Sequence, residues 1–249
     1  MPRFCANLSM LFQELPLLER FAAAAHAGFE AVEVLFPYDD PTPLIQRALI
    51  SSGLPLALIN TPPPNWTGGN RGFAAVPGSE DRFRHDFKRT LRYADVLRPR
   101  FIHIMAGAAS GTDALDAFTN NLTWAAAEAP NQRLTIEPIN TDDMPGYFLN
   151  DYTQAAEILD RVAAPNLHMQ FDAYHAHKIT GDMLTTWRTH AHRIAHIQIA
   201  SPNGRHEPDR SPVDYPNFFN TLDDSGYADF VSAEYIPRTT TTEGLGWMI

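Results

Sequence analysis

Eight short apolar runs alternate along the chain with segments in which apolar residues recur at helical spacing. Strands that alternate with helices in this way favour a parallel α/β sheet, and eight strands suffice to close a (β/α)8 TIM barrel. An open doubly wound sheet is the alternative, but no glycine-rich dinucleotide-binding motif follows any of the runs. The predicted strands are Phe4–Leu8, Ala31–Leu35, Leu54–Ile59, Phe101–Met105, Leu134–Glu137, Leu167–Asp172, Ile194–Ile199 and Phe230–Glu234.

Five amphipathic segments between these runs are predicted as helices. The first carries Leu17, Leu18, Phe21 and Ala25 and ends at Gly28, a residue that commonly terminates a helix. The others lie around 83–97, 115–122, 152–162 and 215–222. No linker divides the chain, and 249 residues of which 44% are hydrophobic can form one large core, so we expect a single domain spanning residues 1–249.

Composition excludes several classes of protein. The net charge of −10, from 19 Lys and Arg against 29 Asp and Glu, is the opposite of what a nucleic-acid surface needs. No apolar run approaches the ~20 residues of a transmembrane helix, and the first residues lack the apolar region of a signal peptide. The single Cys5 rules out an internal disulfide and suits a reducing compartment. We therefore expect a cytoplasmic protein without nucleic-acid or membrane partners.

Four successive runs in the second half each end in a polar side chain that can bind a metal ion. These residues, Glu137, Asp172, Gln198 and Glu234, lie about 26 to 36 residues apart, the repeat length of a strand–helix unit. In a parallel barrel the carboxyl ends of all strands point to one face, so the four side chains can converge. Three carboxylates and an amide favour a hard divalent cation, and we expect Mg²⁺, with Mn²⁺ as the alternative.

Each of the four residues also has a structural interpretation when it is considered alone. Glu137 could be an acid at a helix N-terminus, Asp172 an N-cap, Gln198 a hydrogen-bonded core amide and Glu234 one half of an ion pair. The metal interpretation is stronger for the set, because buried carboxylates that converge without a cation are costly.

A divalent cation at this position indicates a type of chemistry. It can hold a carbonyl and an adjacent hydroxyl of a substrate and stabilise the enediolate formed when a proton leaves the carbon. Two glutamates can remove and return that proton, and each can do so if one oxygen binds metal and the other stays free. The pattern therefore predicts 1,2-isomerisation or epimerisation of a hydroxy-carbonyl compound.

Longer motifs resemble the hydroxypyruvate isomerase family, within the xylose-isomerase-like TIM barrels that also include sugar epimerases and AP endonucleases. The matching segments run almost from end to end. They are residues 4–12, 36–38, 136–140, 172–175, 196–200, 234–235 and 240–245.

The resemblance implies that Glu137, Asp172, Gln198 and Glu234 bind the metal and that Glu137 and Glu234 are the acid/base pair. It also implies that His175 contacts substrate, and it matches Asn60 to an asparagine of the family. On position alone, Arg205 follows Gln198 on the next loop and is expected to bind a substrate oxygen or carboxylate. Further candidates to contact substrate or line the pocket are Glu207, Trp66 and Arg71, although Glu207 could instead orient Arg205 or Asn203.

The rim of the site departs from the family pattern at three places. Ile59 stands where relatives often have histidine, the loop Gly107-Ala108-Ala109 has no lysine, and the run from Asp209 to Asp214 differs from the usual Gly-Thr-Gly-Glu. A cation for a substrate carboxylate must therefore come from elsewhere, and Arg205 is the expected one.

The predicted reaction is the conversion of hydroxypyruvate into 2-hydroxy-3-oxopropanoate, also called tartronate semialdehyde. Isomerisation of a four-carbon 2-oxo acid (2-oxo-tetronate) or 3-epimerisation of a ketose is the alternative. A DNA-repair nuclease of the same fold would want more histidine ligands and a basic surface, and a silent binding protein would not need Glu137 and Glu234. The partner is thus a small hydroxy-oxo acid or sugar, and assembly into a homo-oligomer is left open.

Overall fold

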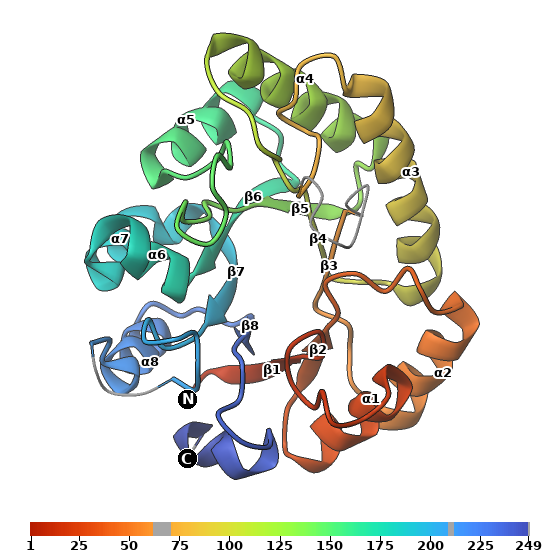
Figure 1. The fold of residues 1–249 in the computed structure, drawn as a ribbon, viewed down its shortest axis with the longest axis vertical. Helices are drawn as coiled ribbons and strands as arrows, with labels where there is room; N and C mark the ends of the chain where they lie inside the picture. The colour runs from red at the N-terminus through yellow and green to blue at the C-terminus, as the bar shows by residue number, and fades with distance from the viewer. Residues whose placement is uncertain (62–70, 209–211, 249) are drawn as a thin grey trace.

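Eight parallel strands lie side by side in one sheet, in the order β2-β1-β8-β7-β6-β5-β4-β3, with helices outside them (Figure 1). The structure is a computed structural model that describes residues 1–61, 71–208 and 212–248. The strands are β1 Arg3–Asn7, β2 Ala31–Glu33, β3 Leu58–Asn60, β4 Phe101–His103, β5 Arg133–Ile136, β6 Leu167–Asp172, β7 Ile194–Ile199 and β8 Phe230–Ala233.

The two edge strands of this sheet, β2 and β3, meet and nearly close the barrel. Val34 donates a backbone hydrogen bond to Leu58 at 3.2 Å, and Asn60 donates one to Leu35 at 2.8 Å. The predicted barrel is therefore confirmed, and so are all eight strands, with β6 and β7 at their predicted bounds. The regular part of β3 starts at Leu58 rather than Leu54, because Pro55 has no N–H to donate to a ladder.

Helices surround the barrel and bury its outer face (Figure 1). All five helices that were predicted from the sequence are present, and they are α1, α3, α4, α5 and α8. Helices α2, α6 and α7 were not predicted. Two short 3-10 helices, Ala191–Arg193 and Thr242–Met248, complete the described elements. The bounds are α1 Leu17–His26, α2 Thr42–Ser52, α3 Glu80–Leu97, α4 Thr112–Glu128, α5 Tyr152–Val162, α6 Ala173–Thr180, α7 Met183–His190 and α8 Tyr215–Asp224.

The large apolar core lies between the barrel and the helices, where Phe87, Phe118, Phe171 and Phe218 are fully buried. Side chains of a strand alternate between its two faces, so every second residue faces the barrel interior instead. In β8, Val231 and Ala233 join the outer core, while Ser232 takes the other face. Among the described helices, none is long and apolar enough to cross a membrane.

Candidate active site

The carboxyl ends of the strands enclose a cavity of about 260 Å³, which we call the inner chamber. Seven residues singled out from the sequence line it, and they come from β3, β5, β6, β7, β8 and the segments that follow them. Asp172, at the end of β6, is fully buried and reaches the same group of side chains through Arg205. The predicted residues in the lining are Asn60, Arg71, Glu137, His175, Gln198, Arg205 and Glu234.

Arg205 lies among the carboxylates of the inner chamber. Its Nη2 donates to Oδ2 of Asp172 at 3.2 Å and to Oε1 of Glu234 at 2.8 Å. The guanidinium carbon also stands 5.0 Å from the centre of the Tyr174 ring. Burial alone would lower the pKa of Arg205, but the carboxylates of Glu234 and Asp172 raise it above its usual range. Arg205 is therefore a permanent cation at this site.

One guanidinium does not balance the acids around it. Burial raises the pKa of Glu137 well above its usual range, and the nearby charges of Asp172 and Glu234 raise it further. Burial likewise raises the pKa values of Glu234 and Asp172, although Arg205 opposes both shifts. Carboxylates that repel each other in a buried site favour an additional cation. Their oxygens, with the amide oxygen of Gln198, are donors that suit a hard divalent ion.

A tighter subset of possible ligands is formed by Glu137, Asp172 and His175, whose ligand atoms all lie within 4.8 Å of one another. The hydrogen bonds of His175 bear on its role. Its Nδ1 accepts from the backbone N–H of Asn140 at 3.4 Å and lies 2.7 Å from the side-chain Nδ2 of that residue. Burial lowers the pKa of His175, so the ring is neutral and its proton sits on Nε2. A protonated Nε2 donates hydrogen bonds and cannot bind metal, which favours contact with a substrate oxygen.

The amide of Gln198 is hydrogen-bonded at both ends, to Glu33 and to Gln170, neither of which was singled out from the sequence. Its Nε2 donates to Oε1 of Glu33 at 2.8 Å, and its Oε1 accepts from Nε2 of Gln170 at 2.7 Å. Since a carboxylate only accepts, Glu33 fixes which end of the amide is oxygen. Gln170 also donates to Oε2 of Glu137 at 3.0 Å and accepts from Thr135. This network orients two of the predicted metal ligands.

His103, at the end of β4, was also missed. Burial, together with the nearby His196, lowers the pKa of His103 to about 3, so the ring is neutral. Its Nδ1 lies 3.3 Å from Oδ1 of Asn60 and 3.7 Å from Oε2 of Glu137, and both are acceptors. His103 is therefore hydrogen-bonded to the predicted substrate residue Asn60, and it lies near the predicted base Glu137 without a hydrogen bond to it. Two of the missed residues, Gln170 and His196, share one signal: they precede Asp172 and Gln198 by two positions, and residues two apart in a strand face the same side.

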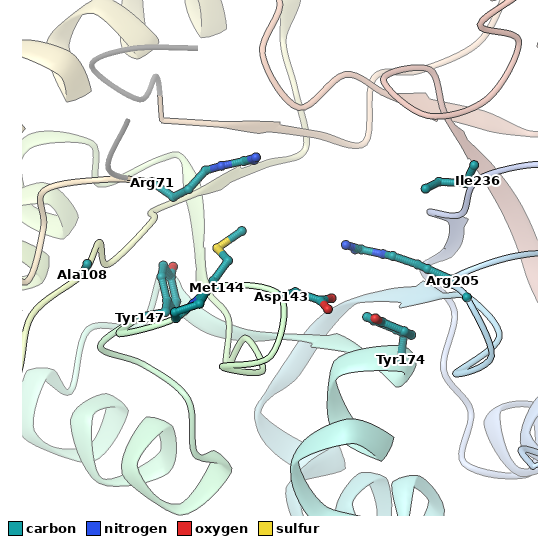
Figure 2. Close-up of a pocket in the computed structure, with 10 residues that line it drawn as sticks. Arg71, Ala108, Asp143, Met144, Tyr147, Tyr174, Arg205 and Ile236 are labelled. Carbon is teal, nitrogen blue, oxygen red and sulfur yellow. The ribbon is translucent and has the colours of Figure 1, made fainter. Parts of the chain in front are cut away.

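A second cavity of about 720 Å³, the outer chamber, adjoins the inner one, and Figure 2 shows the residues that line it. Arg71, Met144 and Arg205 line both chambers. The wall of the outer chamber is completed by Ala108, Asp143, Pro145, Tyr147, Tyr174, Gly204 and Ile236. Trp66 and residues 209–211, which the sequence analysis also discussed, lie outside the described residues.

Glu207 is the predicted site residue that the structure does not bring to either chamber. Its Oε1 accepts from the backbone N–H of Arg238 at 2.9 Å, and its Oε2 pairs with the guanidinium of Arg238 at 3.1 Å. A Cβ on Gly244 would lie 2.5 Å from Oε1 of Glu207, so the C-terminal segment passes directly over this carboxylate. The contacts of Glu207 are those of a residue that fastens a loop to the end of the chain, and they involve neither Arg205 nor Asn203.

Comparisons with known proteins agree with this geometry. The family model described as "Xylose isomerase-like TIM barrel" matches residues 21–249. A 2-oxo-tetronate isomerase from Cupriavidus necator is 45% identical over 254 residues, covering 100% of this chain and 98% of the relative. A hydroxypyruvate isomerase from Escherichia coli is 39% identical, with the same coverage of both chains.

A crystal structure described as "AP endonuclease, family 2" from Brucella melitensis superposes with a TM-score of 0.96. It is 42% identical and covers 100% of this chain and 98% of its own. The names of the two isomerases agree with the enzyme class expected from the sequence, and all three relatives agree with the expected family. The chain belongs to the xylose isomerase-like TIM barrel family.

Proposed function

We propose that this protein is a divalent-metal-dependent isomerase of small hydroxy-oxo acids, which exchanges a carbonyl and a hydroxyl between neighbouring carbons. One observation carries the proposal: two buried glutamates, Glu137 and Glu234, line one chamber together with an amide and a neutral histidine. Glu137, Asp172, Gln198 and Glu234 would hold the metal. When bound, the ion would supply positive charge to the substrate oxygens and the carboxylates.

The reaction can be written for hydroxypyruvate. One glutamate takes a proton from the hydroxyl-bearing carbon, and the electron pair left behind forms a double bond to the carbonyl carbon, whose oxygen becomes negative. A proton then returns to the former carbonyl carbon, and the hydroxyl proton passes to the neighbouring oxygen, which leaves an aldehyde at the other carbon. No net proton is gained or lost, so two carboxylates that alternate as acid and base suffice.

The remaining residues of the chamber have matching tasks. Nε2–H of His175 would donate to the reacting oxygen, and the guanidinium of Arg205, on the loop after the neighbouring strand, would hold a substrate oxygen. Gln170 donates to Oε2 of Glu137, which would keep a second lone pair for the metal, and Oε1 would transfer the proton. Mg²⁺ is the proposed ion and Mn²⁺ the alternative, because both accept oxygen ligands.

Two substrates are proposed. Hydroxypyruvate follows from the sequence motifs and from the relative of that name, and a four-carbon 2-oxo-tetronate is favoured by the relative at 45% identity. Solved structures of ketose 3-epimerases share the fold at 15–20% identity, which supports the barrel alone.

The test is a metal-depletion experiment with both acids. The chelated protein is expected to be inactive, and added Mg²⁺ or Mn²⁺ should restore interconversion of one acid with its isomer, with solvent deuterium appearing on the reacting carbon. A metal-loaded protein that catalyses neither turnover nor deuterium exchange for either acid would overturn the proposal. Cleavage of abasic DNA by the same preparation would replace it with a nuclease function.

A further inference from the structure

Two arginines face each other where the inner and outer chambers meet. Arg71 enters from the segment after β3 and Arg205 from the loop after β7, and Figure 2 shows them extending toward one another from opposite sides of the cavity. Both line both chambers. A substrate in the inner chamber therefore lies within a space that has a guanidinium on each side of its opening.

The two arginines differ in what they already bind. Arg205 is paired with Asp172 and Glu234 and packs over Tyr174. Arg71 is exposed, and no hydrogen bond or ion pair joins it to another residue in the part of the chain that the structure describes. The nearest acid on the wall of the outer chamber, Asp143, is engaged by the side chain of Asn140 at 3.2 Å. Arg71 is thus the arginine of the pair whose charge is not committed to the protein.

The backbone next to Arg71 is fixed by contacts that only glycine allows. Gly72 forms a bridge with Ala106, and a Cβ on Gly72, whose φ is +99°, would lie 2.2 Å from the carbonyl oxygen of Met105. A Cβ on Gly107 would lie 2.3 Å from the carbonyl oxygen of Gly72. Ala75 adds a backbone hydrogen bond to Ala106 at 2.8 Å. The loop after β4 carries no lysine, but its backbone packs against the segment that contains Arg71 and thereby fixes the position of that segment.

The position of the proposed acid/base pair decides which way a 2-oxo acid can enter. Its reacting carbons must lie next to Glu137 and Glu234, which line the inner chamber but not the outer one, so its carboxylate points away from them, toward the opening. At the opening it meets Arg71, whose planar fork can hold a carboxylate through two parallel hydrogen bonds.

We propose that Arg71 binds the substrate's carboxylate and thereby selects acids over neutral sugars, while Arg205 serves the reacting end. This deepens the proposed function and rests on it for the orientation of the substrate. From the sequence, Arg205 was expected to bind the substrate's carboxylate. Because Arg205 is already paired with Asp172 and Glu234, we assign that carboxylate to Arg71 instead.

The test compares an acid with its neutral counterpart on the metal-loaded protein. Glycerate and dihydroxyacetone are titrated, by ligand-observed NMR, into wild type, Arg71→Met, Arg71→Lys and the control Arg47→Met, an exposed arginine on α2 that lines neither chamber. Arg71→Met is expected to raise the Kd for glycerate about 10- to 100-fold, the range for one lost charged hydrogen-bonding group, and Arg71→Lys less. The Kd for dihydroxyacetone and both Kd values of Arg47→Met should stay near wild type.

Turnover gives an independent readout. Arg71→Met should raise KM for the acid substrate with a much smaller change in kcat, because the carboxylate is bound equally before and during the reaction. The inference is overturned if Arg71→Met binds glycerate as wild type does, or if it loses glycerate and dihydroxyacetone to the same extent. If the wild-type protein binds glycerate through Arg71 but isomerises no hydroxy-oxo acid, the proposed function is wrong, whereas the carboxylate-binding role of Arg71 is retained.

Discussion

The two halves of the barrel end their strands in different kinds of polar residue. In the first half the ends, Asn7, Glu33, Asn60 and His103, are joined to their neighbours by hydrogen bonds. In the second half, Glu137, Asp172 and Glu234 face one another, and burial raises their pKa values.

Glu33 makes the contrast plain, because it is as buried as any acid of the second half. Its Oε1 accepts from Asn7 and Gln198, and its Oε2 accepts from His196, each at 2.8 Å. A carboxylate supplied with three donors is a fixed part of the scaffold. Glu137 and Glu234 have fewer donors, Gln170 for the first and Arg205 for the second, and so keep capacity for a cation or a proton. The same residue type is thus a support in one half and a proposed reagent in the other.

The strongest challenge to this contrast is removal of charge in the second half. Glu137→Gln and Glu234→Gln should each reduce turnover by roughly 10²- to 10⁴-fold, the usual contribution of a proton-transferring group. Metal content has to be measured on each variant, because either glutamate is also a proposed ligand. Near-normal turnover in a variant with metal bound would remove that residue from proton transfer.

The same substitution in the first half should act differently. Glu33→Gln would place an NH₂ group against one of the three donors that the carboxylate now accepts from. We expect the free energy of unfolding to fall by ~1–3 kcal/mol. We also expect metal binding to weaken about 10- to 100-fold, the range for residues that orient metal ligands. At saturating metal its kcat should fall far less than that of Glu137→Gln. Metal titration calorimetry and thermal unfolding measure these effects. The control is Glu30→Gln, at an exposed carboxylate that pairs with Arg3.

If the metal affinity of Glu33→Gln is unchanged, Glu33 is not needed to orient the amide of Gln198. The proposed supporting role of the first half of the barrel would then be wrong.

The smallest expected effect separates the two arginines, which also come from different halves. Arg205→Lys keeps the charge but loses the forked geometry, and the loss of about one charged hydrogen bond should raise KM about tenfold. We expect equal increases for hydroxypyruvate and for dihydroxyacetone, because Arg205 would serve the reacting end that both share. If KM rises for hydroxypyruvate but not for dihydroxyacetone, Arg205 rather than Arg71 binds the substrate's carboxylate.

The sequence was sufficient for the barrel, because eight mostly apolar runs of strand length alternate with segments of helical spacing. The helices it missed have specific causes. Helix α6 begins at Ala173, directly after β6, with Asp172 as its N-cap, so no turn separates it from the strand. Helix α2 starts at Thr42, where Pro41 and Pro43 read as a loop.

The site was only partly predictable for a similar reason. Glu137, Asp172, Gln198 and Glu234 were found because each follows an apolar run, whereas Glu33 sits at the end of a three-residue strand and looks like a surface acid. Gln170 and His196 lie inside strands. The partner of Gln170 follows the neighbouring strand, 33 residues away, whereas the partner of His196 comes from across the barrel, 163 residues away. Pairings of that kind depend on closure of the barrel, which a single sequence does not display.

The approach of Gly72 and Gly107 has a consequence for attempts to redesign this enzyme. The atoms that a new Cβ would strike first are backbone atoms of Met105 and Gly72, so no rearrangement of side chains can make room for it. A mutagenesis library aimed at larger substrates should leave these two glycines untouched. The width of the opening can be varied instead at Ala108, Met144 and Ile236, whose side chains line the outer chamber.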